Sequence, residues 1–484
     1  MCPALLLVLN QWQIPDVAVR LHFVAVARDR QPLSASGTPQ HDRQESNLPG
    51  GSRHALAGAA ITGSAAAGQT AGQTARTESS ARLGAASAAA AESVGPPAYA
   101  ERCLVKESYA CLRAYPHWAM EYLYARLFVQ HPHLRSLFPL SMEQTRSATF
   151  EMLTRLVGGL DNERETEELL GRLGRSHRKF GVLDKHHQPF FDALLAAAEQ
   201  LAGPAWTAQA DAAWRSVLGY FAATMQAAAA RDAKEQPAWW VGEIVQHDRR
   251  TPTIAVLTIR PDRPIGYRPG QYIWLQVPRW PRIWRSYSIA NAPRGNGLID
   301  IHVRAVPGGI VSTTLVSHCR AGDMVTLGAP AGDLAVSPDT DRDLVCVAGG
   351  TGLAPVKALV EAVVGGARQG RRRAVTIYVG ARHSDELYDM RDLETLRLAY
   401  PPLTLVPVVE RELEFAGRIG RLPEVVRSHP SFRDTDVYVG GPAGLISATA
   451  RALSGRVPAG HLHHDSLAAL RAADRPDTAE QLRD

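Results

Sequence analysis

The stretch Leu344-Val345-Cys346-Val347-Ala348-Gly349-Gly350-Thr351-Gly352-Leu353-Ala354-Pro355 has the pattern of a buried strand, a glycine-rich turn and the start of a helix. A short, valine-rich apolar run is typical of a strand that is covered on both faces. Glycines allow a pyrophosphate to approach the backbone, and a helix N-terminus favours its negative charge. Pro355 suits the first turn of the helix. The stretch therefore predicts a parallel α/β domain with a nucleotide site at Gly349 to Pro355.

The residues that follow continue a strand–helix alternation typical of a doubly wound sheet. Further strands are predicted at Ala374–Val379, Leu403–Val408 and Asp436–Val439, with helices beginning near Pro355, Asp389 and Leu422. A second glycine turn, Gly440-Gly441-Pro442-Ala443-Gly444, comes directly after the last strand. Since ligands bind at the carboxyl ends of parallel strands, we expect Gly441 and Pro442 to lie beside the first turn. For each of the two glycine turns, the alternative interpretation is an ordinary strand-to-helix turn that binds no ligand.

Upstream, from Trp239, the pattern changes to strand-like alternation punctuated by proline and glycine, which predicts a small antiparallel β-barrel. Its strands are predicted at Val241–Val245, Thr253–Ile259, Gln271–Val277, Leu298–Val303 and Met324–Leu327. The third is followed by Arg285-Ser286-Tyr287-Ser288. Arg285 can bind a flavin pyrophosphate bidentately, Tyr287 can stack on the isoalloxazine ring, and Ser288 can form a hydrogen bond near the reactive edge of that ring. Gly308-Gly309-Ile310-Val311-Ser312 offers backbone amides and a hydroxyl for the same phosphates.

The segment before the barrel is predicted to be entirely helical. Apolar residues recur at helical spacing, with hardly a strand candidate. The helical runs cover residues Leu112–Phe128, Phe150–Val157, Glu165–Phe180, Pro189–Leu201 and Trp206–Arg231. The chain thus has the order helical, barrel, α/β.

Composition limits the alternatives. The 484 residues suffice for about three domains, and the net charge of +5 is interspersed, so nucleic-acid binding is not expected. The Arg371-Arg372-Arg373 triplet is interpreted as a solvated turn. Five widely spaced cysteines without a CxxC motif argue against a disulfide framework, a zinc site or an iron–sulfur cluster. No membrane span is predicted and a cytoplasmic location is expected. Residues 1–100, rich in Ala, Gly and Ser, are expected to be disordered.

The stretch from Trp239 to about His464 resembles the ferredoxin–NADP reductase superfamily, whose members carry RxYS, GxxS, GGTG..P and a CGP-like turn in this order. The resemblance implies FAD bound by Arg285, Ser286, Tyr287 and Ser288, with Gly309, Val311 and Ser312 at its phosphates. It also places Tyr272 against the flavin. Gly440 stands where many relatives have cysteine near the nicotinamide, which implies slower hydride transfer.

The helical segment resembles the globin domain of flavohaemoglobins, and the domain order is that of the same family. The match Tyr122-Leu123-Tyr124-Ala125-Arg126-Leu127-Phe128 implies that Tyr124 is the distal tyrosine above haem b. Phe138 matches the phenylalanine that wedges the haem. Gly174-Arg175-Ser176-His177 implies that His177 is the proximal iron ligand. His186 and His187 are rivals in a loop-like stretch.

The resemblance has departures around the expected haem. The family's nitric oxide dioxygenases support the proximal histidine with a Tyr–Glu relay, but His187 stands at the tyrosine position. The glutamate position falls near Arg231 by ungapped counting. Ser176 precedes the histidine in place of a lysine, and the distal polar residue is either Gln144 or Thr145. Loss of an anionic partner is expected to leave the iron less electron-rich.

These observations predict a multidomain protein with an all-α globin at 101–235, an antiparallel β-barrel FAD domain at 236–338 and a doubly wound NAD(P) domain at 339–465, then a loose tail. We expect NADH or NADPH to reduce FAD, and FAD to reduce haem b that binds O2 and reacts with NO. The alternatives are a flavin reductase with another acceptor and a gas-sensing globin. Arg382 could bind the 2′-phosphate of NADPH, but Asp385 follows it closely, so NADH is slightly favoured over NADPH. The sequence leaves the oligomeric state open.

Overall fold

The computed structural model describes residues 95–336, 340–367, 370, 372–458 and 460–464. Residues 1–94, which make up most of the segment expected to be disordered, lie outside the described residues, as does the C-terminal tail from residue 465. No helix of the described ranges is long and apolar enough to cross a membrane.

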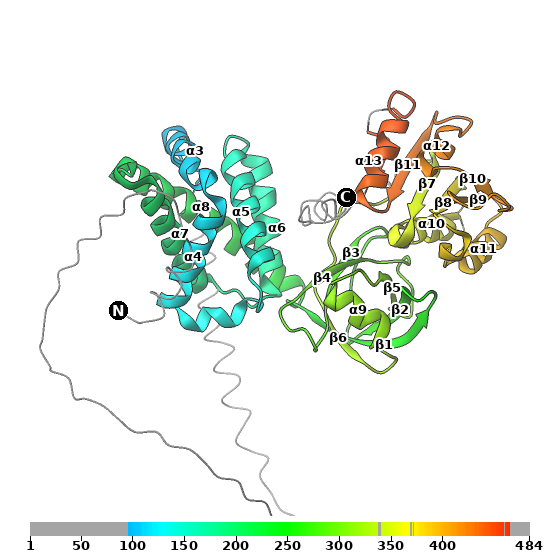
Figure 1. The fold of residues 1–484 in the computed structure, drawn as a ribbon, viewed down its shortest axis with the longest axis horizontal. Helices are drawn as coiled ribbons and strands as arrows, with labels where there is room; N and C mark the ends of the chain where they lie inside the picture. Colours follow the sequence, from blue (N-terminus) through cyan, green and yellow to red (C-terminus); the bar gives the residue numbers. More distant parts are fainter. Residues whose placement is uncertain (1–94, 337–339, 368–369, 371, 459, 465–484) are drawn as a thin grey trace, which may run out of the picture. The chain divides into compact units, whose positions relative to one another are not determined.

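The first described segment is helical, as predicted. Its core is formed by apolar residues at helical spacing, among them Leu112, Leu123 and Trp214, which are essentially inaccessible to solvent. The helices are α3 (Tyr99–Ala114), α4 (Pro116–Gln130), α5 (Glu143–Gly158), α6 (Glu163–Arg178), α7 (His187–Ala202) and α8 (Ala208–Glu235), with 3-10 turns η1 (Pro132–Leu137), η2 (Asp184–His186) and η3 (Gly203–Ala205) (Figure 1).

Helices α6 and α8 cross with their backbones in contact. A Cβ at Gly174 of α6 would lie 2.2 Å from the carbonyl oxygen of Met225 in α8, so only glycine permits this approach. Arg178, at the end of α6, forms an ion pair with Asp232 and donates a hydrogen bond to the carbonyl of Gln236 at 2.8 Å. The crossing brings the residues around Met225 close to the last turn of α6.

The second segment is a nearly closed antiparallel barrel with the strand order β4-β3-β6-β1-β2-β5. Its edge strands approach through an Ile289–Ile301 bridge, with the Ala290 amide donating to the Asp300 carbonyl at 2.8 Å. The elements are β1 (Trp240–Arg249), β2 (Ile254–Pro261), β3 (Tyr272–Gln276), β4 (Arg285–Ser288), β5 (Ile299–Arg304), α9 (Ile310–Ser317) and β6 (Met324–Leu327).

The third segment is a parallel sheet with the order β10-β9-β8-β7-β11-β12. Helices α10 and α11 cover one face and α12 and α13 the other, giving two apolar cores (Figure 1). The elements are β7 (Asp343–Gly349), η4 (Gly350–Gly352), α10 (Leu353–Ala367), β8 (Val375–Ala381), η5 (Ser384–Glu386), α11 (Met390–Ala399), β9 (Leu403–Val409), β10 (Arg418–Ile419), α12 (Leu422–Arg427), β11 (Thr435–Gly440), α13 (Ala443–Ala452) and β12 (Leu462–His464).

The strand order positions the candidate nucleotide site. From β7 the chain proceeds outward through β8 and β9, and then returns to β11 on the other side of β7. The carboxyl ends of β7 and β11 therefore meet at the point where the order reverses, which is where open α/β sheets bind ligands. Both glycine turns begin at these two strand ends.

The fold class is confirmed, and three local interpretations are corrected. Arg285 to Ser288 form a strand of their own, paired antiparallel with β3, since Tyr287 and Ile273 are partners in that ladder. Residues 184–187 are helical, so His187 begins α7. Arg373 is not a solvated turn residue: it is 6% exposed, with its guanidinium 3.5 Å from Asp436.

Candidate functional site

Most of the candidate site residues predicted from the sequence line one large cavity. Its volume is about 2280 Å³, against roughly 300–1,000 Å³ for a typical small-molecule site, so it has room for more than one cofactor. The predicted site residues that line it are Tyr124, Phe138, His177, Arg285, Tyr287, Ser288, Gly309, Gly349, Gly350, Thr351, Gly352, Pro355, Gly441 and Pro442.

His177 lies in the last turn of α6 and faces this cavity. Burial lowers the pKa of His177 to about 4, and nearby His187 and Lys179 act in the same direction, so the imidazole is neutral at pH 7. Its Nδ1 atom is buried and has no hydrogen-bond partner among the described residues. A neutral imidazole facing an apolar cavity fits the axial ligand of a haem iron.

The residue beside His187 is Gln226, not Arg231. The Gln226 Nε2 atom in α8 lies 3.2 Å from His187 Nδ1 in α7, within hydrogen-bond distance. Arg231 is exposed. The contact with His187 is thus made five residues before Arg231 in α8, about one and a half helical turns away. The two groups in contact are an imidazole and an amide, and neither is anionic.

Tyr124 lies in α4 and lines the same cavity as His177. Its ring is 4% exposed and packs against the rings of Phe128, Phe138 and Phe190, at centroid distances of 5.8, 5.5 and 6.2 Å. Burial raises the pKa of Tyr124 to about 12, so the phenol stays protonated. Its hydroxyl lies 2.7 Å from the hydroxyl of Thr149.

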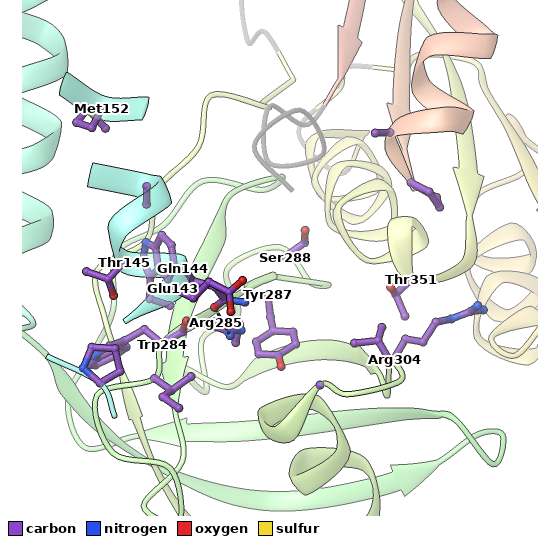
Figure 2. A pocket seen from close by; sticks show the side chains of 18 of the residues that line it. Glu143, Gln144, Thr145, Met152, Trp284, Arg285, Tyr287, Ser288, Arg304 and Thr351 are labelled. Atoms are coloured by element: carbon purple, nitrogen blue, oxygen red, sulfur yellow. Dashed lines mark hydrogen bonds between the residues drawn. The ribbon is translucent and has the colours of Figure 1, made fainter. Parts of the chain in front are cut away.

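Neither predicted distal polar residue contacts Tyr124 through a hydrogen bond in the described structure. Gln144 instead accepts a hydrogen bond from the Arg285 guanidinium at 3.0 Å, and Thr145 lines the cavity nearby (Figure 2). Thr149 is the residue that the sequence reasoning missed. It lies one helical turn after Thr145 in α5, and only the contact with Tyr124 distinguishes the two.

The barrel contributes Arg285, Tyr287 and Ser288 to the cavity wall (Figure 2). Alternation along β4 places Arg285 and Tyr287 on one face and Ser286, which is 7% exposed, on the other. Ser288, the last residue of the strand, also lines the cavity, although alternation alone would place it with Ser286. Tyr272 pairs with Ser288 across the ladder but does not line the cavity. Trp274 and Trp284 line it instead, and neither was identified from the sequence.

Only some of the hydrogen-bond donors in the predicted phosphate-binding stretch Gly308 to Ser312 are free to bind a phosphate. The Gly309 amide donates to the Val306 carbonyl at 2.9 Å, and the Ser312 hydroxyl donates to the Gly309 carbonyl at 3.0 Å. Val311 and Ser312 are buried and do not line the cavity, whereas Gly309 does. The serine thus shapes the turn that opens α9, and the amides of its first turn are the remaining donors.

The end of α6 contacts the barrel through Lys179. Its ammonium lies 4.2 Å from the ring centroid of Trp274 and donates to the Ser176 hydroxyl at 2.7 Å. Burial lowers the pKa of Lys179 to about 7. Phe180 packs edge-on against Trp284 at 6.3 Å. Aromatic rings therefore lie between the helix that carries His177 and the strands that carry Tyr287.

The two glycine turns of the α/β segment touch through their backbones. A Cβ at Gly352 would lie 2.2 Å from the carbonyl carbon of Gly440, and a Cβ at Gly440 would lie 2.2 Å from the carbonyl oxygen of Gly352. Gly350 adopts a φ of +54°, which favours glycine. Leu353 and Ala354 are 1% exposed and pack inward, so the wall is formed by Gly349 to Gly352 and Pro355.

Charged residues around these turns suit an anionic dinucleotide. Arg304, which the sequence reasoning missed, extends from β5 on the side of the cavity that holds Thr351 (Figure 2). A Cβ at Gly350 would lie 3.3 Å from its guanidinium, and its Nε atom is buried with no hydrogen-bond partner in the described part of the chain. Arg382 and Glu386 also line the cavity, whereas Asp385 does not. The acidic residue that borders the cavity beside Arg382 is therefore Glu386.

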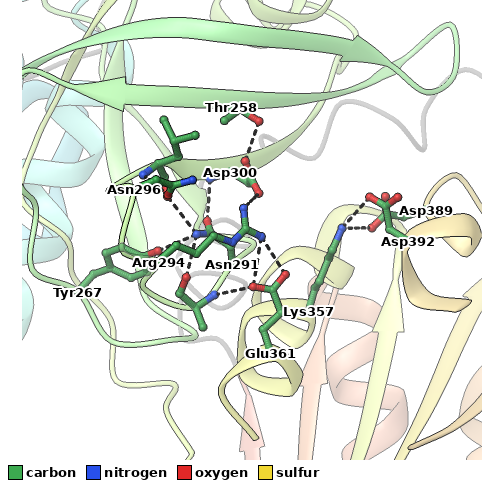
Figure 3. A network of polar contacts seen from close by, with 12 residues as sticks. Thr258, Tyr267, Asn291, Arg294, Asn296, Asp300, Lys357, Glu361, Asp389 and Asp392 are labelled. Carbon is green, nitrogen blue, oxygen red and sulfur yellow. Dashed lines mark hydrogen bonds and ion pairs between the residues drawn. The ribbon is translucent and has the colours of Figure 1, made fainter. Parts of the chain in front are cut away.

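A polar network fastens the barrel to the α/β segment (Figure 3). Arg294 donates to Asp300 at 2.8 Å and to Glu361 of α10 at 3.0 Å. Within the α/β segment the buried Lys357 ammonium donates to Asp389 at 2.8 Å and to Asp392 at 3.0 Å, and Arg250 of the barrel donates to the same Asp392 at 3.1 Å. This arrangement holds α10, which begins at the first glycine turn, against the barrel.

Family models match three consecutive parts of the chain. They are described as Globin (residues 121–225), Oxidoreductase FAD-binding domain (242–335) and Oxidoreductase NAD-binding domain (346–451). The cofactor classes thus fall on the three segments whose geometry is described above.

Individual relatives agree with this order. The Flavohemoprotein of Rhizobium meliloti is 26% identical over 76% of this chain and 93% of its own length. The NAD(P)H-flavin reductase of Aliivibrio fischeri is 30% identical over 40% of this chain and 82% of its own length. A flavohemoglobin structure from Malassezia yamatoensis with bound FAD and heme has a TM-score of 0.62 at 18% identity, covering 76% of this chain and 98% of that one. The chain spans 56–64% of the curated bacterial oxygenase reductase components that it also matches.

Proposed function

The chain belongs to the flavohaemoglobin family, an NAD(P)H and FAD oxidoreductase with a globin domain, and from this premise we propose that it is a nitric oxide dioxygenase. In the proposed reaction two nitric oxide and two dioxygen molecules react with one NAD(P)H to give two nitrate ions, NAD(P)⁺ and one proton. The two electrons of the hydride are delivered singly, one for each nitrate. We assign residues 101–235 to haem, 236–338 to FAD and 339–465 to the nucleotide.

When bound, haem supplies an iron that binds diatomic gases, and FAD converts a hydride into single electrons. The residues of this chain bind and orient these groups. His177 would present a neutral imidazole to the iron, and Tyr124 holds a phenolic proton in the same cavity. Phe138 and Phe190 pack around the phenol and keep this region apolar.

On the reductase side, Arg285 provides a cation for flavin phosphates, and Tyr287 and Ser288 line the cavity beside it. Gly349 to Gly352, Gly441 and Arg304 surround the expected nucleotide pyrophosphate. The observation that carries the proposal is that Tyr124 and His177 line one apolar cavity that continues to Tyr287 and to the glycine turns.

The test is nitric oxide consumption by the purified full chain with NADH and oxygen, with nitrate as the measured product. We expect NADH and nitric oxide to be consumed in a ratio of one to two, with loss of consumption in His177→Ala. Reduction of the flavin by NADH should persist in this variant. A wild-type chain that reduces its haem under NADH, but consumes nitric oxide no faster than the variant, would refute the proposal.

A second candidate is a flavin reductase that serves another electron acceptor. The uncharged His187–Gln226 pair favours it, because without an anionic partner the proximal imidazole is a weaker electron donor to the iron. Rapid NADH oxidation with ferricyanide or free flavin, unaffected by His177→Ala and without nitrate formation, is the outcome expected for this function.

A further inference from the structure

Two tyrosine–threonine hydroxyl pairs link α5 to neighbouring helices. Tyr109 of α3 lies 2.6 Å from Thr154, and Tyr124 of α4 lies 2.7 Å from Thr149. Both threonines belong to α5 and both tyrosines are at least nine-tenths buried. Only the second pair lines the cavity that faces His177. The two pairs therefore form an internal comparison within one helical segment.

The two threonines differ in where their protons are used. The Thr154 hydroxyl donates to the carbonyl of Phe150, four residues earlier, at 2.8 Å. With its only proton committed to the backbone, Thr154 must accept from Tyr109. Thr149 has no such bond to a backbone carbonyl, and Tyr124 is its only hydrogen-bond partner among the described residues. Its proton is therefore available to Tyr124.

We propose that Thr149 donates its hydroxyl proton to the Tyr124 oxygen and so leaves the Tyr124 proton directed at a diatomic ligand in the cavity. Thr149 is then a positioning residue that acts through Tyr124. The inference rests on the proposed function only in requiring haem beside His177. It assigns the distal polar role to Thr149 and not to Gln144 or Thr145, the residues expected from the sequence.

The direction of this hydrogen bond has chemical consequences. A phenol that accepts one hydrogen bond is polarised and becomes a better donor through its own proton. The ring has little freedom to turn, because Phe128, Phe138 and Phe190 contact it on several sides. If Tyr124 instead donated to Thr149, its proton would point away from the ligand, and the phenol would offer the ligand only a lone pair.

The experiment compares Thr149→Val and Thr149→Ser in the full chain with haem bound. The readouts are the oxygen dissociation rate constant and the C–O stretching frequency of the carbon monoxide complex. Loss of one neutral hydrogen bond corresponds to about a fivefold change, so Thr149→Val should release oxygen about five times faster and Thr149→Ser should resemble the wild type. The C–O frequency should rise in Thr149→Val because the positive field at the ligand weakens.

Thr154→Val is the matched control: it makes the same substitution in the same helix and removes the other hydroxyl pair, so neither readout should move. Tyr124→Phe should release oxygen faster than Thr149→Val, and the double variant should equal Tyr124→Phe, because Thr149 acts only through the phenol. Slower oxygen release in Thr149→Val, no change in it, or an effect additive with Tyr124→Phe would each overturn the proposal. Failure of haem binding itself would still be seen separately as loss of the Soret band.

Discussion

Substituting Gly440 by cysteine tests how the two glycine turns are built. The resemblance to the reductase superfamily expects cysteine at this position and slower hydride transfer without it. In this chain, however, a Cβ at Gly440 would lie 2.2 Å from the carbonyl oxygen of Gly352. The obstructing atom belongs to the backbone, so no side chain can rotate to make room. We therefore predict that Gly440→Cys impairs the nucleotide site.

The magnitude follows from the contact distance. Ordinary van der Waals contact begins at 3.4 Å, so the turns must separate by about 1 Å to admit the new side chain. Over-packing of this kind costs about 1–3 kcal/mol. Since the pyrophosphate is expected to contact both turns, separation weakens its binding. The cost corresponds to a roughly 5- to 150-fold increase in the Kd for NADH.

The assay is titration of the full chain with NAD⁺ or NADH, together with stopped-flow measurement of flavin reduction. Gly365→Ala is the control, because Gly365 lies in α10 of the same segment, and its added Cβ has no described atom within 4 Å. This control should leave the Kd unchanged. If Gly440→Cys bound NADH as tightly as the wild type and reduced the flavin faster, the two turns would not be in contact in solution.

Three further perturbations follow from the same structure. Gly174→Ala should destabilise the helical segment by about 1–3 kcal/mol in thermal unfolding followed at the Soret band, whereas Gly219→Ala, whose Cβ meets open space in α8, should not. Arg304→Leu should raise the Kd for NADH about tenfold, as expected for loss of a charge-assisted hydrogen bond, with exposed Arg320→Gln as the unaffected control in the same titration. Burial holds the pKa of His177 at about 4, below its usual 6.5, so the unfolded chain binds the extra proton first. The contribution of His177 to the free energy of unfolding of the haem-free chain is therefore complete above pH 6.5. It should fall by up to about 3 kcal/mol as the pH drops toward 4, measured by denaturant titration.

The order of the segments and both glycine turns could be predicted because their signals are local. A valine-rich strand followed by glycines and a proline specifies its own geometry through backbone sterics, and β7, η4 and α10 occur where this pattern predicts them. The alternation in the barrel likewise predicts which side chains share a face. It does not predict that Arg285 to Ser288 pair as a strand, since that depends on β3 as a partner.

The residues that were missed are those set by contacts between distant elements. Gln226 of α8 contacts His187 of α7, and the packing of two helices cannot be found by counting along the chain. The arginine triplet predicted a solvated Arg373, but this residue is buried and forms an ion pair with Asp436, a buried residue of β11. Thr149 and Thr145 are equivalent by spacing along α5. The position of Tyr124 on another helix decides between them.

The proximal and distal sides of the expected haem pocket differ in the hydrogen-bonding groups that they offer. On the proximal side, His177 has no acceptor for its Nδ1 atom among the described residues, and its neighbours His187 and Gln226 form an uncharged pair. On the distal side, Tyr124 keeps a protonated phenol held by a second hydroxyl. A weak proximal donor leaves less electron density for a ligand, whereas a strong distal donor favours a ligand that carries negative charge. Oxygen retention in this chain should therefore depend more on Tyr124 and Thr149 than on the proximal pair. A larger effect of Gln226→Glu than of Tyr124→Phe on oxygen dissociation would contradict that ordering.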